Sequence, residues 1–227
     1  DDINHPTGTA LIFVANSGEN CIAVAPGANY SLLPGSISRF SEVIDVADII
    51  IMQAEIPYET NKKIALLAKQ KGKKVLFNPA PACLLDEELM KAIDILVVNE
   101  VEAAFISGID YTGNNHEKIA QALIEAGAQN VVITLGSQGV YMKNNQKTVY
   151  LPGYKVNAID TIAAGDTFCG ALAVSCAQRE IDQEALGFAN AAAAIAVTRS
   201  GAQPSIPTLD EVKCFILEKE SVLSFNS

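Results

Sequence analysis

The chain contains 227 residues, of which 49% are hydrophobic, and it carries a formal net charge of −10 at pH 7. A chain of this length suits one large α/β domain and can bury a sizeable core. The acidic excess argues against nucleic-acid and anionic-membrane partners, because phosphate-rich surfaces attract clustered lysine and arginine.

The predicted elements alternate between strands and helices along the chain. Apolar runs on either side of Gly18 predict a β-hairpin formed by residues 9–15 and 21–25. The continuous apolar run 46–53 is typical of a strand that is buried on both faces. The remaining pattern predicts strands at 73–78, 95–99, 130–135, 139–143 and 147–152, and helices at 61–72, 84–92, 100–108, 116–127, 166–179, 183–199 and roughly 208–219.

This alternation predicts an α/β fold in which helices cover both faces of a mostly parallel sheet. Ligands of such sheets bind beyond the carboxyl ends of the strands. No internal repeat or linker interrupts the pattern, so residues 1–227 are predicted to form a single domain.

The five cysteines are scattered and form no C-x-x-C pair. This pattern disfavours zinc sites and a disulfide framework, so a reducing cytoplasm is the expected setting. Cys169 and Cys176 fall on one face of the predicted helix 166–179, which is typical of small buried thiols.

The segment DTIAAGDTFCGAL, residues 160–172, predicts an anion site. Ala163, Ala164 and Gly165 have almost no side chain, so backbone amides at this strand-to-helix turn can approach a ligand closely. The first amides of a helix lack partners within it, and the helix dipole adds partial positive charge. The chain contains neither a Walker loop nor a G-x-G-x-x-G fingerprint. The turn therefore indicates a phosphate site without a lysine.

Asp166 follows this turn, and two interpretations remain open from spacing alone. As a carboxylate beside the anion site, it could take a proton from an alcohol that attacks an in-line phosphoryl group. Aspartate is also a preferred helix N-cap, a role that requires no ligand. Spacing alone favours the cap.

Asn99 and Glu102 are spaced as a capping box before an apolar helix, which is again a structural role. Glu55 ends the apolar run 46–53 on the side where such sheets bind ligands. Without further context, a glutamate there is more often a solvated residue that opens a helix.

Segments along nearly the whole chain resemble the ribokinase-like (PfkB-type) sugar kinases, in the order of that family. DTIAAGDTFCGAL is similar to the family's C-terminal signature. The other matching segments are PTGTALIFV, GANYSLLP, MQAEIP, NPAPA, VVNEVEAA, TLGSQGV and AAAAIAVTRSGAQPSIP. The resemblance implies a three-layer α/β/α fold with a mostly parallel central sheet and a small β lid that includes residues 9–25.

The resemblance also implies roles for individual residues. Ala164 and Gly165 belong to the anion hole, and Asp166 is the base that also contacts the sugar hydroxyl. Glu55 holds sugar hydroxyls. Asn99 lies near the nucleotide phosphates, and Glu102 acts on magnesium through water. The ATP-binding loop and its adenine-side residue are Thr134, Leu135, Gly136, Ser137, Gln138, Gly139 and Asn190.

A potassium site is implied as well. Asp160 and the carbonyl of Ile162 form part of it. Backbone groups and one hydroxyl complete it, at Ala196, Arg199, Gly201 and Ser205. On the residues alone, the segment RSGAQPS is better explained as a turn that ends a helix.

The implied activity is ATP-dependent phosphorylation of D-ribose at its 5-hydroxyl, with Mg²⁺ and with activation by K⁺. Another pentose, a ketose or a nucleoside is the alternative acceptor, and a non-catalytic sugar- or nucleotide-binding module is the alternative outside catalysis. A cytoplasmic homodimer is expected. The family's first strand and its Gly-Gly-Lys-Gly segment have no counterpart here, so the lid and the sheet are expected to be N-terminally incomplete.

Overall fold

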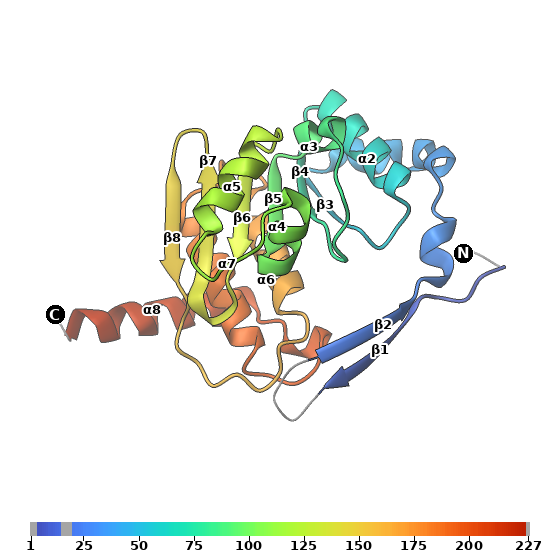
Figure 1. Cartoon of the computed structure of the whole chain (residues 1–227). Helices are drawn as coiled ribbons and strands as arrows, with labels where there is room; N and C mark the ends of the chain where they lie inside the picture. The colour runs from blue at the N-terminus through green and yellow to red at the C-terminus, as the bar shows by residue number, and fades with distance from the viewer. Residues whose placement is uncertain (1–3, 15–19, 226–227) are drawn as a thin grey trace. The chain divides into compact units, whose positions relative to one another are not determined.

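The computed structural model describes residues 4–14 and 20–225 (Figure 1). Its strands are β1 (Thr9–Val14), β2 (Asn20–Ala25), β3 (Ile49–Gln53), β4 (Lys74–Asn78), β5 (Ile95–Asn99), β6 (Asn130–Thr134), β7 (Gly139–Asn144) and β8 (Thr148–Pro152). Its helices are η1 (Gly27–Ser31), η2 (Pro34–Phe40), α1 (Ser41–Val46), α2 (Tyr58–Gln70), α3 (Glu87–Ala92), α4 (Glu100–Ser107), α5 (His116–Glu125), η3 (Gly136–Gln138), α6 (Ala164–Cys176), α7 (Gln183–Ala196), η4 (Gln203–Ser205) and α8 (Leu209–Phe225).

The strands form two sheets. β1 and β2 pair antiparallel, with Thr9 opposite Ala25, which confirms the predicted hairpin outside the undescribed residues 15–19. The second sheet is six-stranded and mostly parallel, in the order β3-β4-β5-β6-β7-β8, and helices flank it. The predicted α/β class is therefore confirmed.

The prediction that the run 46–53 is buried on both faces is wrong for the strand that it contains. β3 is the first strand in the sheet order, with β4 as its partner. Ile51 in its middle is 44% exposed, although Met52 is buried. A strand at the edge of a sheet has a neighbour on one side only, so its side chains receive less cover than those of β5 or β6.

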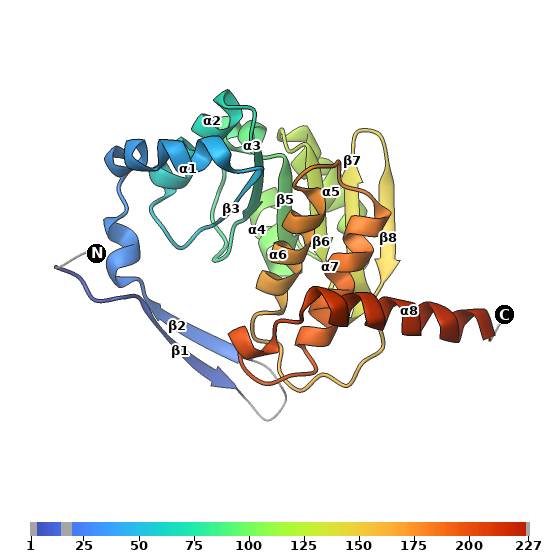
Figure 2. The ribbon, with the colours of Figure 1, turned by 180° about the vertical axis from the view of Figure 1, so that it is seen from behind.

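Contacts divide the chain into two compact units. The first comprises residues 1–133 and 142–148, and the second comprises residues 134–141 and 149–227. In the first unit the core is built from side chains such as Phe77, Leu96 and Leu123, all 1% exposed or less. In the second unit, α6 packs along α7, and α7 contacts α8 (Figure 2). Ile195 and Val212 belong to the core between α7 and α8.

Within the described ranges, no helix combines the length and the apolar character that crossing a membrane requires.

Candidate active site

The turn before α6 adopts a conformation that is rare for its residue type. Ala163 has φ 59° and ψ 10°, and it is the one non-glycine residue with positive φ among those the structure describes. Such a backbone costs about 1–3 kcal/mol and is typical of functional sites. The amide of Thr167 donates to the Ala163 carbonyl at 2.9 Å and closes the first helical turn. Ala163, rather than Asp166, is therefore the N-cap of α6.

The interpretation of Asp166 as a helix cap is thus wrong, because α6 begins two residues earlier than the sequence suggested. Asp166 is the third residue of α6 and its side chain is exposed. The amides of Gly165 and Asp166 donate to no acceptor in the described part of the chain. Two free amides and an unpaired carboxylate consequently lie together at one helix end.

A cavity of about 500 Å³ lies in the second unit and includes this helix end. Ala164 and Gly165 form part of its wall. Predicted nucleotide residues from three separate segments also line it, namely Thr134, Gly136, Ser137, Gly139, Gly165 and Asn190. The remaining wall is mostly apolar and includes Phe168, Ala193 and Val197. An apolar cavity with a few polar groups and an anion-binding end suits a nucleotide.

Two residues of the predicted ATP-binding loop 134–139 do not line the cavity. Leu135 is 2% exposed and belongs to the core. Gln138 contributes through its carbonyl, which accepts hydrogen bonds from the amide of Gly153 at 3.1 Å and the hydroxyl of Tyr150 at 2.9 Å. Both residues therefore shape the loop from behind the cavity wall.

The loop 134–139 depends on close backbone packing at two glycines, Gly139 and Gly153. Gly139 has φ 104°, and a Cβ there would lie 2.1 Å from the carbonyl oxygen of Leu151. A Cβ on Gly153 would lie 2.2 Å from the carbonyl oxygen of Ser137. The Asn190 amide group donates to the Pro152 carbonyl at 3.0 Å and holds the same edge of the cavity. Sequence analysis identified Gly139 and Asn190 but missed Gly153.

Asp160 joins the two segments that were predicted to bind potassium. Its Oδ1 accepts from the amide of Ile162 at 2.9 Å, and its Oδ2 accepts from the amide of Gly201 at 3.0 Å. These two amides lower the pKa of the Asp160 carboxyl. The amide of Asp160 donates to the Val197 carbonyl, next to Ala196. The structure therefore brings Asp160, Ile162 and Gly201 together, as predicted from the resemblance.

The other predicted potassium residues lie at the last residue of α7 and on the segment that follows it, as far as η4. The Ala196 carbonyl accepts from the amide of Arg199 at 3.0 Å. Ser205 is completely buried, and its hydroxyl donates to the Ala202 carbonyl at 2.7 Å. The oxygen atoms gathered here are the carbonyl and hydroxyl oxygens of this segment and the carboxylate of Asp160. These are the ligand types that hard cations prefer.

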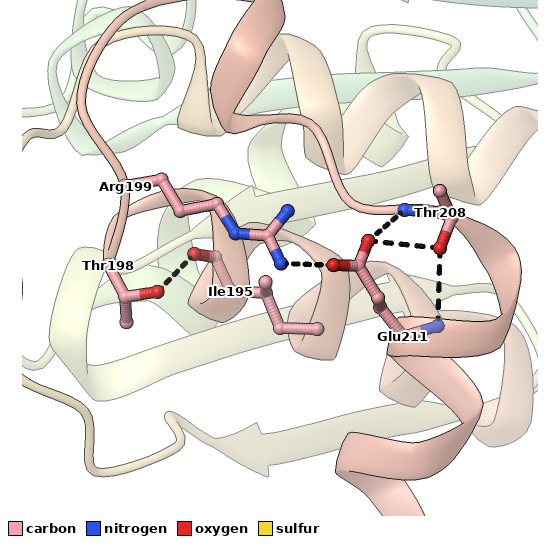
Figure 3. Close-up of polar contacts among 5 residues, drawn as sticks. All are labelled: Ile195, Thr198, Arg199, Thr208 and Glu211. Atoms are coloured by element: carbon pink, nitrogen blue, oxygen red, sulfur yellow. Dashed lines mark hydrogen bonds and ion pairs between the residues drawn. The ribbon is translucent and has the colours of Figure 1, made fainter.

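The side chain of Arg199 ties this loop to the start of α8 (Figure 3). Its Nη2 donates to Glu211 Oε1 at 2.6 Å. Glu211 Oε2 accepts from the amide of Thr208 at 2.7 Å and from its hydroxyl at 2.9 Å, and the amide of Glu211 donates back to that hydroxyl at 3.4 Å. Thr208 and Glu211 thus form a reciprocal capping arrangement, which the Arg199 guanidinium completes.

We expect Glu211 to contribute to stability in a defined acid range. The Arg199 hydrogen bond, followed by the bonds from Thr208, lowers the pKa of Glu211 from 4.5 to about 2. A depressed carboxyl pKa stabilises the fold above the unfolded value, and this contribution disappears as pH falls through the folded value. At a pH above 4.5 the wild type should therefore have a higher melting temperature than Glu211→Gln. This difference in melting temperature should vanish as the pH falls towards 2.

Thermal melts followed by circular dichroism across this range provide the measurement. Arg199→Met is the matched variant, because it removes the largest cause of the shift and should move the acid transition to higher pH. If the melting temperatures of the wild type and Glu211→Gln depended on pH in the same way over the acid range, the assigned contribution of Glu211 to stability would be contradicted.

Asn99 and Glu102 form the predicted capping box at the start of α4 in the first unit. The amide of Glu102 donates to Asn99 Oδ1 at 2.8 Å, and the amide of Asn99 donates to Glu102 Oε2 at 2.9 Å. Asn78, at the end of β4, donates to the same Oε2 at 3.3 Å. Glu102 is 8% exposed, and this burial raises the pKa of its carboxyl against the effect of these hydrogen bonds.

The capping box and Asn78 use only one carboxylate oxygen of Glu102. Within the described residues, no hydrogen bond reaches Glu102 Oε1. A nearly buried carboxylate with a free acceptor fits a role beside a hydrated divalent cation. Asn78 was not predicted as a site residue, although its position at the end of a buried strand was a usable signal.

Glu55 follows β3 in the first unit and has an exposed side chain. The preceding residue, Ala54, donates its amide to the Ala80 carbonyl at 3.0 Å. Asn61 from α2 donates to the carbonyl of Gln53 at 2.7 Å. Two hydrogen bonds therefore hold the backbone immediately before Glu55, while its carboxylate is exposed.

Comparison with known proteins decides the family. Residues 1–209 match the pfkB family of carbohydrate kinases. The chain belongs to this family.

Several relatives of this pfkB-family chain are ribokinases. It is 41% identical over 211 residues to the ribokinase of Haemophilus influenzae, and the aligned region covers 92% of this chain and 69% of that protein. It is 33% identical over 207 residues to the deoxyribokinase of Salmonella typhi, covering 90% of this chain and 68% of that one. The structure of Arabidopsis thaliana ribokinase complexed with ribose and ATP matches with a TM-score of 0.84 and 32% identity, covering 93% of this chain and 70% of that one.

Proposed function

We propose that this pfkB-family chain phosphorylates D-ribose at O5 with ATP as phosphoryl donor. The observation that carries the proposal is the end of α6, where Gly165, with a free amide, lines a cavity of about 500 Å³ and the next residue, Asp166, has a free amide and an exposed carboxylate. The ribokinase relatives and the ribose–ATP complex of the Arabidopsis enzyme support ribose and ATP as substrates.

The proposed chemistry assigns the proton and the phosphoryl group to neighbouring residues. The Asp166 carboxylate takes the proton of the ribose 5-hydroxyl as O5 attacks the γ-phosphorus of ATP. A bond forms between O5 and phosphorus, the bond from phosphorus to the bridging oxygen breaks, and ADP leaves. The amides at Gly165 and Asp166 stabilise the negative charge on the phosphoryl oxygens during transfer.

The proposal includes two cations, Mg²⁺ and K⁺. Glu102 would hold Mg²⁺ through water, and Asn99 would lie near the nucleotide phosphates. A magnesium ion there would neutralise phosphate charge during such transfers. The loop bridged by Asp160 is proposed to hold K⁺ with its oxygen ligands. Because Asp160 also bonds the amide of Ile162, immediately before Ala163, a cation there would brace the turn that presents Gly165.

A second acceptor deserves direct comparison, because the deoxyribokinase of Salmonella typhi is also a relative. Ribose and 2-deoxyribose differ by one hydroxyl, and a site built to bind a hydroxyl rejects the analogue that lacks it. A sugar-binding module without catalysis is the other alternative. The unpaired Asp166 supports an enzyme, since a binding module has no need of a base.

A coupled ADP-release assay on the naturally expressed protein tests this function. We expect ribose to give the highest kcat/KM in a panel with 2-deoxyribose, fructose and adenosine. Chelation of Mg²⁺ should abolish turnover, and replacing K⁺ by a large organic cation should lower it. Turnover of 2-deoxyribose alone would move the assignment to that sugar, and no ADP release with any acceptor would favour the binding module.

We also propose a reducing, cytoplasmic setting and a homodimer. Within the described residues, Cys83, Cys169, Cys176 and Cys214 form no disulfide, and Cys169 and Cys176 are buried in α6. On the hairpin, Leu11 is 60% exposed and Val24 is 53% exposed, which offers an apolar surface to a second copy.

A further inference from the structure

The cavity beside α6 has an unusual charge balance. Its wall contains glycine, alanine, apolar, hydroxyl and amide residues, and Lys155 is its one formally charged residue. No aspartate or glutamate lines it, although the chain carries a net charge of −10. The cavity wall is therefore locally cationic on an acidic protein.

The two residues before Lys155 are held in place by packing. Gly153 is packed so tightly against Ser137 that a Cβ would not fit. The Tyr154 ring meets the Phe215 ring edge-on, with centroids 5.1 Å apart. The position of Lys155 at the cavity is consequently set by packing of its two preceding residues.

The charge of Lys155 has no partner in the described part of the chain. Its side chain is exposed and makes no ion pair or hydrogen bond there. Other lysines of this protein are neutralised, as in the pair between Lys62 and Asp86 at 2.9 Å. An uncompensated ammonium group at the rim of a cavity attracts anionic ligands.

The helix end in the same wall supplies a second positive feature. Ala164 and Gly165 line the cavity, and the partial positive charge of a 13-residue helix is centred on its first amides. The ligand that suits both features carries several negative charges and an apolar ring for the wall formed by Ala193 and Val197. A nucleoside di- or triphosphate has this composition.

We infer that Lys155 is a specificity-determining residue that binds the phosphate chain of the nucleotide, so that affinity depends on the number of phosphates. This inference rests on the proposed kinase function and extends it to a residue outside the family signature. A lysine is a point charge on a flexible stem, so it can follow the phosphates of both ATP and ADP.

Equilibrium binding of adenosine, AMP, ADP and ATP to the protein without sugar tests the inference by calorimetry. Lys155→Met keeps most of the length of the side chain and removes its charge. We expect this variant to bind ADP and ATP about tenfold more weakly, as for a lost hydrogen bond to a charged group, and to bind adenosine as the wild type does. Lys155→Arg should restore most of the loss.

Lys213 provides the matched control, because it is an exposed lysine on α8 that does not line the cavity. Lys213→Met should leave all four affinities unchanged. If Lys155→Met weakened the binding of adenosine and ATP equally, Lys155 would contact the nucleoside rather than the phosphates, and the inference would be overturned. Unchanged ATP binding by this variant would also overturn it. A wild type that binds no nucleotide would overturn the proposed function together with it.

Discussion

Replacing Asp166 with alanine should lower turnover by roughly two to four orders of magnitude, the range for losing a positioned general base. Asp166 does not cap α6, makes no hydrogen bond with the described residues, and is exposed beside two free amides. A carboxylate that supports no part of the fold is expected to act on a ligand. Stopped-flow or coupled measurement of kcat with ribose and ATP gives the comparison.

Asp166→Asn is the matched variant, since it keeps the shape of the side chain and removes its ability to accept a proton. Both variants should bind ADP nearly as the wild type does and melt within about 4 °C of it, because an exposed acid in the first helical turn contributes little to stability. Turnover that survives in both variants would reject Asp166 as the base. Loss of ADP binding would instead assign it to nucleotide binding.

Much of the fold could be predicted because its signals are local. β5 lies at Ile95–Asn99 as predicted, since a short apolar run between turn residues specifies a buried strand. The capping box at Asn99 and Glu102 was equally evident from two residue types at one spacing. These features need no information about the rest of the chain.

The failures occur where distant segments decide the structure. The start of α6 was placed at Asp166, because no local preference indicates that Ala163 adopts a left-handed backbone. The segment containing η2 and α1 was not predicted. These helices of 7 and 6 residues show no helical period and have no side-chain N-cap, whereas the equally short α3 begins at the capping residue Asp86. Lys155 was missed because only the folded chain brings it to the same cavity as Gly165 and Asn190.

The glycine of the anion site allows a test that separates function from folding. Gly165 is the second residue of α6, and a Cβ added there would meet no atom within 4 Å. Alanine is favoured over glycine in a helix by about 0.5–1 kcal/mol, so Gly165→Ala should fold at least as well as the wild type. In a protein that only needs to fold, this substitution would be harmless.

With a substrate bound, the same methyl group would occupy the space in front of the free amides. We expect the kcat of Gly165→Ala to fall by roughly two orders of magnitude or more, as when a donor to a developing anion is lost. Gly170 is the matched control, because it lies in the same helix and also has no atom within 4 Å of an added Cβ. Gly170→Ala should raise the melting temperature without affecting kcat. If Gly165→Ala proved as active as Gly170→Ala, close approach of the phosphoryl group to this helix end would be excluded, because the methyl group has no other neighbour to disturb.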